Sequence, residues 1–177
     1  QNDTERKLNS VYGTLELSYD NKLFFDVTGR NDWSSTLPKG NQSFFYPSVG
    51  MSAVISKMVE MPEAVSYLKL RASYAATGNS TDPGVMNNSY ILCVLPGSVT
   101  NPTVLTDPNL KNENTTALEF GVDLRLFDSR LNFDIDLYDY TTKNQILTSP
   151  ISQASGVSSR RFNAGEINSK GIEIILA

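Results

Sequence analysis

Apolar and polar residues alternate at every second position through most of this chain, and no segment repeats its apolar residues with the 3.6-residue period of a helix. Such alternation predicts β-strands, because successive side chains of a strand point to opposite faces. Seven segments show the pattern: residues 11–19, 23–30, 45–56, 67–76, 116–126, 131–138 and a last one from near 162 to 176.

The charged residues of these segments all fall on one of the two faces. The other face carries none over the same spans, so it contacts a medium that rejects charge. Two architectures produce such a face: a soluble sandwich with a dry interior, and a membrane barrel with a lipid-facing exterior. The charged set is Glu16, Asp26, Arg30, Lys69, Arg71, Glu119, Asp123, Arg125, Asp134, Asp136 and Glu173.

Segment length and the order of the connections favour the barrel. The segments are mostly ~8–12 residues long, close to the ~9–11 of a tilted spanning strand, whereas soluble strands cluster near ~5–6. Short connections at 20–22, 57–66 and 127–130 alternate with long polar ones at 31–44, 78–115 and 141–161, which show no strand pattern. This order puts every long loop on one side, as in outer-membrane barrels with short periplasmic turns and long extracellular loops.

We therefore expect an all-β fold, an antiparallel arc of about seven long strands from a large transmembrane β-barrel. Seven strands alone would leave two unpaired edges in lipid. The chain begins with a polar segment and stops inside a predicted strand, so we expect residues 1–177 to be part of a larger barrel domain. The alternative is a soluble β-sandwich carbohydrate-binding domain.

The four-residue turn at 127–130 also predicts a register. Counting outward places Asp123 opposite Asp134 and Arg125 opposite Asn132. Because like charges directly opposite repel, Arg125 is expected to lean diagonally toward Asp134. Glycines inside the strands, such as Gly13 and Gly121, are expected to mark points of curvature.

Composition removes several functional classes. The net charge is −4, which argues against a nucleic-acid surface. The longest apolar run is far shorter than a spanning helix requires. The chain has no His, the usual neutral-pH general base, and its single cysteine, Cys93, can form no internal disulfide. We expect no catalytic residue, no metal site and no cofactor.

Five stretches, in order along the chain, resemble the SusC/RagA-type TonB-dependent outer-membrane transporters of Bacteroidota. The resemblance runs from about Val11 to the end. The stretches are GRNDWSS at 29–35, YPSVG at 46–50, LKLRASYAATGN at 68–79, the hairpin 110–146 and NAGEINSKGIE at 163–173.

The resemblance implies a barrel of ~22 strands with a plugged lumen in the bacterial outer membrane. The plug and the segment that contacts TonB would lie before residue 1. The implied partners are a SusD-like surface lipoprotein that closes over the barrel, TonB, outer-membrane lipid, and a glycan or peptide as substrate.

Three residues are candidates for substrate binding: Asp32, Trp33 and Tyr90. Trp33 could stack on a sugar ring, or instead anchor its loop or sit at the membrane interface. Tyr90 could contact the lid protein or pack within its own loop. Asp134 and Asp136 have a spacing that an acid/base pair could use, but a solvated wall is the favoured interpretation.

Overall fold

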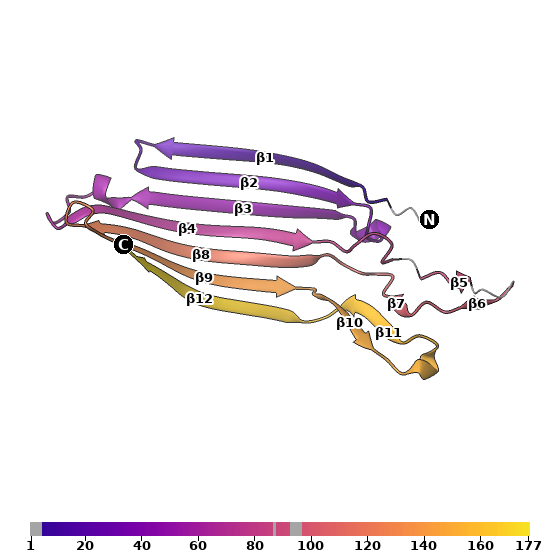
Figure 1. Cartoon of the computed structure of the whole chain (residues 1–177). Coiled ribbons are helices and arrows are strands. Elements are labelled where there is room, and N and C mark those ends of the chain that lie inside the picture. The colour runs from indigo at the N-terminus through magenta and orange to yellow at the C-terminus, as the bar shows by residue number, and fades with distance from the viewer. Residues whose placement is uncertain (1–4, 87, 93–96) are drawn as a thin grey trace.

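The computed structural model describes residues 5–86, 88–92 and 97–177, and its main element is one antiparallel sheet. The strands pair in chain order, as Figure 1 shows, apart from short segments inserted in the loops. The sheet contains β1 (Leu8–Tyr19), β2 (Leu23–Ser34), β3 (Ser43–Val54), β4 (Val65–Asn79), β8 (Glu113–Leu126), β9 (Leu131–Lys143) and β12 (Glu166–Leu176). The predicted arc of seven strands is confirmed.

The strands have 11 to 15 residues, so most extend beyond the predicted segments into the stretches expected to be loops. Two tight turns close hairpins at one end of the sheet. Asp20 and Asn21 turn the chain between β1 and β2, and Phe127 to Ser129 turn it between β8 and β9, all with positive φ. Lys22 donates a hydrogen bond to Asp20, which lowers the pKa of that carboxyl.

The long connections gather at the opposite end, as predicted (Figure 1). They are not structureless, however. β10 (Ile146–Pro150) pairs antiparallel with β11 (Ser159–Asn163), and β11 pairs parallel with β7 (Val104–Thr106), so two loops distant in sequence form one small sheet. The other described elements of the long connections are β5 (Ile91–Leu92), β6 (Val99–Thr100) and two short 3-10 turns, η1 (Lys39–Asn41) and η3 (Gln153–Ser155). A third 3-10 turn, η2 (Ile55–Lys57), lies in the connection between β3 and β4, at the hairpin end of the sheet.

The start predicted for the last strand was wrong. Phe162 belongs to β11, where it pairs with Leu147, and β12 begins only at Glu166. Gly165 lies between them with a φ of 84°, a left-handed conformation that breaks the extended chain.

The register places all eleven predicted charged residues on one face of the sheet, which we call the charged face. Glu16, Asp26, Gly50, Ser73, Glu119 and Tyr138 are successive cross-strand partners, and the other charged residues follow from them by even steps along their strands. We call the opposite side the apolar face. Toward the loops the apolar face does carry charge. Asp139 and Lys143 lie on β9 beyond its predicted segment, but Glu166 and Lys170 lie within the last predicted segment, so the expectation that this face is free of charge was wrong there.

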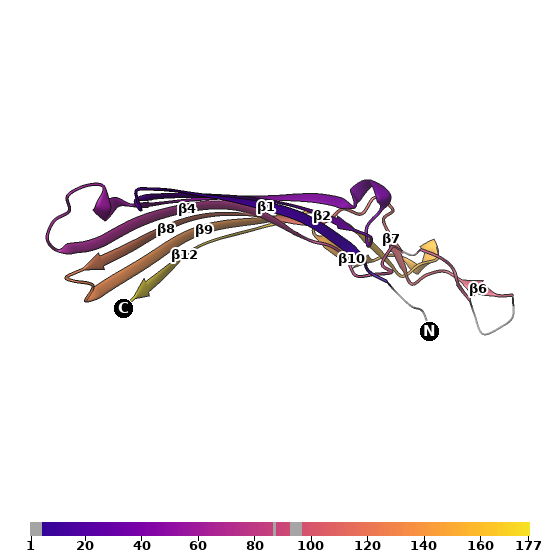
Figure 2. The same ribbon diagram turned by 90° about the horizontal axis from the view of Figure 1, so that it is seen from above.

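The apolar face has no protein covering it among the described residues. Phe120 is 51% exposed and Ile174 is 62% exposed, whereas a sandwich would bury both. In the part of the chain that the structure describes, the buried hydrophobic residues are few, Leu37, Val54 and Leu110. Figure 2 shows the sheet from above as a single curved layer. In the described part of the chain, no helix is both long and apolar enough to span a membrane.

The predicted hairpin register is confirmed, since Asp123 lies opposite Asp134 and Arg125 opposite Asn132. The predicted partner of Arg125 was wrong. Its guanidinium binds Asp123 on its own strand at 3.0 Å and lies over the Tyr67 ring, 4.8 Å from the centroid. Asp134 is occupied by a different arginine, described next.

A polar inner wall as the candidate functional site

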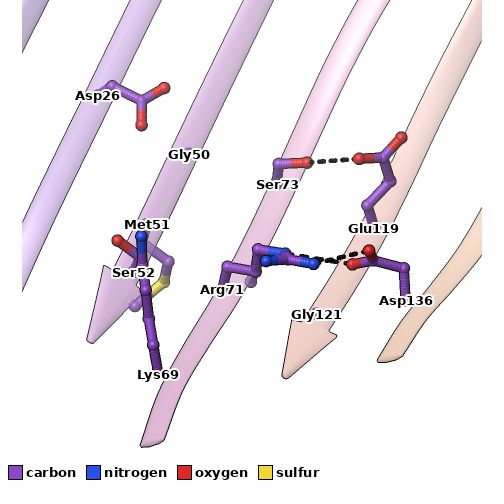
Figure 3. A pocket seen from close by; sticks show the side chains of 11 residues that line it. Asp26, Gly50, Met51, Ser52, Lys69, Arg71, Ser73, Glu119, Gly121 and Asp136 are labelled. Atoms are coloured by element: carbon purple, nitrogen blue, oxygen red, sulfur yellow. Dashed lines mark hydrogen bonds and ion pairs between the residues drawn. The ribbon is translucent and has the colours of Figure 1, made fainter. Parts of the chain in front are cut away.

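Arg71 is the centre of an ionic cluster on the charged face. It comes from β4 and reaches across β8 to β9, where it binds Asp136 at 2.6 Å (Figure 3). The same guanidinium also binds Asp134. Gly121 lies between, because Arg71, Gly121 and Asp136 are cross-strand partners. A Cβ at position 121 would come within 2.6 Å of the Arg71 Cγ atom. Gly121 therefore provides space for the ion pair, a role beyond the predicted curvature.

Asp134 and Asp136 share one partner. Both carboxylates are ion-paired to the same guanidinium, as fits the charged wall expected for them. Arg71 and Asp136 line a shallow open hollow of about 240 Å³, and Asp26, Lys69, Ser73 and Glu119 are among its other lining residues. The described residues contain no group of three or more His, Cys, Asp and Glu side chains that could hold a metal. The arrangement can bind polar groups by charge and hydrogen bonds.

A second polar group lies next to this cluster, toward the loops. The Tyr140 hydroxyl donates a hydrogen bond to Glu119, and the Ser73 hydroxyl approaches the other Glu119 oxygen at 3.5 Å. Tyr138 stacks on Tyr140 with ring centroids 4.9 Å apart. Gly171 on β12 leaves space for the Tyr138 ring, since a Cβ there would come within 2.8 Å of the ring carbon Cε1. Aromatic rings and carboxylates thus share this part of the charged face.

The structure separates the candidates Asp32 and Trp33. Asp32 is on the charged face, is 7% exposed and accepts a hydrogen bond from the Arg30 Nε atom at 2.7 Å. Trp33 is the next residue along β2 and therefore points to the apolar face, at its loop-side end. Tyr90 is 68% exposed, just before β5. Cys93 lies outside the described residues.

Tyr46 and Asn112 are residues of this wall that the sequence did not single out as candidates. Arg30 is the cross-strand partner of Tyr46, whose hydroxyl accepts a hydrogen bond from the Asn112 side-chain amide at 2.6 Å. These contacts join β2, β3 and the segment before β8. No local motif signals them, because each depends on strands brought together by the register.

The family model described as TonB dependent receptor-like, beta-barrel, matches residues 1–177, the whole chain. The chain belongs to this family. Its curved sheet is accordingly part of a transmembrane barrel in the bacterial outer membrane, with the apolar face toward lipid and the charged face toward the lumen.

The relatives agree with this assignment. TonB-dependent receptor P3 of Formosa agariphila is 37% identical, and the match covers 96% of this chain and 18% of that protein. TonB-dependent receptor SusC of Bacteroides thetaiotaomicron is 27% identical over 96% of this chain and 18% of that protein. Both relatives are named as TonB-dependent receptors. The chain thus spans about a fifth of the length of the curated relatives it matches.

Solved structures give the same result. The RagAB peptide importer in its 'closed-closed' state matches with a TM-score of 0.86 and 26% identity, covering 96% of this chain and 19% of that one. In the 'open-open' state the TM-score is 0.84 at 25% identity, covering 97% and 19% of the two chains. The siderophore receptor PirA of Pseudomonas aeruginosa, at 16% identity and a TM-score of 0.69, shares the fold; it covers 97% of this chain and 31% of that one.

Proposed function

We propose that this chain forms part of the wall and the extracellular loops of a transporter that imports glycans or peptides across the outer membrane. In this proposal a SusD-like surface lipoprotein closes over the loops. TonB supplies the energy through a plug that lies outside this chain. The chain itself binds and guides its cargo and catalyses no reaction.

One observation carries the proposal. The long loops gather at the same end of a wall whose lumen side is lined by polar and charged groups. A loop assembly over a polar wall suits a water-soluble cargo that enters from outside. The likeness to SusC and to the RagAB peptide importer supports this reading and leaves both cargo classes, glycans and peptides, in the proposal.

Asp32 and Tyr90 are the proposed contact residues of this chain. Asp32 and Arg30 form a fixed, polar group on the lumen side near the loops, suited to hydrogen bonding with hydroxyl or amide groups of the cargo. Tyr90 offers an exposed ring in the long loop between β4 and β8, where a lid protein would dock. For Trp33 we propose a position at the membrane surface, where tryptophan is enriched.

The experiment compares Asp32→Asn, Trp33→Ala and Tyr90→Ala in the full-length transporter, expressed in cells from which the native gene is deleted. Uptake of labelled oligosaccharides and peptides is measured with and without a protonophore. We expect Asp32→Asn to reduce uptake at least several-fold, Tyr90→Ala to reduce co-purification of the lipoprotein, and the protonophore to abolish uptake.

Trp33→Ala is the matched control, because it changes the neighbouring residue on the opposite face and should leave uptake unchanged. Uptake that survives the protonophore would contradict energised transport. Cleavage of an oligosaccharide or peptide by the purified transporter would contradict the non-catalytic role.

A further inference from the structure

One row of cross-strand partners crosses the whole apolar face, and the polarity of its side chains changes along the row. On the first five strands its members are apolar or aromatic, and on the last two they are charged. From β1 to β12 the row is Leu15, Val27, Val49, Tyr74, Leu118, Asp139 and Lys170. We call the continuous band of apolar side chains on this face the apolar belt. Its loop-side edge is therefore oblique to the row.

The slope of this edge can be worked out from the register. On β1 and β3 the belt continues four residues beyond the row toward the loops, to Val11 and Phe45. On β9 and β12 it stops two residues before the row, at Leu137 and Ile172. From β1 to β12 the edge thus shifts by six residues, or ~20 Å, across six strand spacings, or ~29 Å. That corresponds to an angle of roughly 35°, within the ~35–45° tilt of strands in outer-membrane barrels.

The agreement identifies the belt edge with the surface of the hydrocarbon layer. A flat membrane surface crosses tilted strands at a different residue on each strand, and the difference is set by the tilt. The charged residues of β9 and β12 therefore lie outside the hydrocarbon, at heights that can be estimated. Because these charged residues are on the lipid-facing side of the wall, the lipid headgroup layer, which adjoins the hydrocarbon, must contact them.

We call a cross-strand pair of charged residues on this face a rung. The first rung beyond the edge, Asp139 with Lys170, is joined to neighbouring polar side chains by hydrogen bonds. The Lys170 ammonium binds the Asp139 carboxylate at 2.9 Å, and its side chain is 65% exposed. The Asn168 amide donates to Asp139 at 2.6 Å and to the Thr141 hydroxyl at 2.8 Å. Asp139 thus holds both neighbours in place, while the exposed Lys170 ammonium keeps donors free for an external acceptor.

A second rung, Lys143 with Glu166 at 3.7 Å, lies four residues farther along each strand. At a tilt of ~35° the first rung is ~5 Å beyond the hydrocarbon edge and the second ~16 Å. The headgroup layer on each side of a bilayer is ~5–7 Å thick. Only the first rung therefore lies at headgroup height.

We propose that the rung Asp139–Lys170, with Asn168, is a binding site for the headgroup of an outer-leaflet lipid. The Lys170 ammonium binds the lipid phosphate, and the acyl chains lie against Leu137 and Ile172 directly below. A lipid is the occupant because the site is continuous with the lipid-facing belt. A second copy of the barrel, or free phosphate from solution, would need no such continuity.

The first test measures bound lipid. Full-length transporter is equilibrated in nanodiscs of phosphatidylglycerol and transferred to detergent, and the retained phosphatidylglycerol is counted by native mass spectrometry. Lys170→Gln should retain at least three-fold less than the wild type. Lys143→Gln removes the same charge above the headgroup layer and should retain the wild-type amount. Equal retention in all three proteins, or an equal loss in both variants, would overturn the proposal.

The second test measures depth and does not depend on lipid retention. Nitroxide labels are placed one at a time at positions 137, 168 and 143 in a cysteine-free full-length background. Their accessibility to oxygen and to a water-soluble nickel complex should place 137 in hydrocarbon, 168 in the headgroup layer and 143 in water. A label at 168 that reads as bulk water would refute the proposal. Protection from both reagents would indicate a protein neighbour and would also refute it.

Discussion

Replacing Val122 by arginine tests the lipid-facing assignment energetically. On β8 the apolar belt runs from Leu118 to Leu126, eight residues or ~27 Å along the strand, or ~22 Å along the membrane normal at a ~35° tilt. This is close to the ~25 Å height of the apolar band of outer-membrane barrels. Val122 is at its middle, with the apolar neighbours Leu70 and Ile135 on either side. An arginine there finds no partner, so it should cost ~2–4 kcal/mol of folding free energy.

Two controls on the same strand separate depth from general damage. Thr116→Arg introduces the same side chain on the same face, beyond the end of the belt, and should cost only ~0–1 kcal/mol. Asp123→Asn changes the residue next to Val122 but on the charged face. It loses one half-exposed ion pair with Arg125 and relieves the repulsion from Asp134, so we expect a change within about 1 kcal/mol.

The assay is reversible folding of the full-length transporter into lipid vesicles as a function of urea, followed by the change in gel mobility of the folded barrel. The expected order of destabilisation is Val122→Arg, then Thr116→Arg, then Asp123→Asn. Equal costs for the two arginine variants would refute the belt position. A cost below 1 kcal/mol at position 122 would refute its contact with hydrocarbon.

The ionic cluster makes further predictions. Gly121→Ala should destabilise the folded barrel by roughly 1–2 kcal/mol, because the new methyl group displaces Arg71 from its carboxylates. Gly13→Ala is the control: the added methyl group meets nothing within 4 Å, so this variant should be neutral or slightly stabilising in the same urea titration. Arg71→Gln should cost a similar ~1–2 kcal/mol by leaving Asp134 and Asp136 uncompensated. Adding Asp136→Asn to Arg71→Gln should recover part of that loss, and strictly additive effects in the double-mutant cycle would contradict the coupling.

The sequence by itself determined the fold class, the two faces and the hairpin register of this protein. The reason is that strand side chains alternate with a period of two, and a one-residue slip would move every apolar side chain to the wrong face. Leu124 and Phe133 therefore had to share a face, and Asp123 had to meet Asp134, once the turn at 127–130 was recognised. The sequence also placed the long loops at one end, because hairpin connections alternate between the two ends of a sheet.

Only the tertiary structure decided which charged residues meet. Arg71 and Asp136 are 65 residues apart in sequence and come together across the gap left by Gly121, whereas Arg125 finds a carboxylate on its own strand. The pairing of β7 with β11 joins two loops in a way that no local pattern encodes, since each segment is too short to have a period of its own. The pairing of Asp139 with Lys170, and of Lys143 with Glu166, likewise required two strands in register. Their meaning depends on the height of each residue in the membrane, which is set by the strand tilt and by the register across all seven strands.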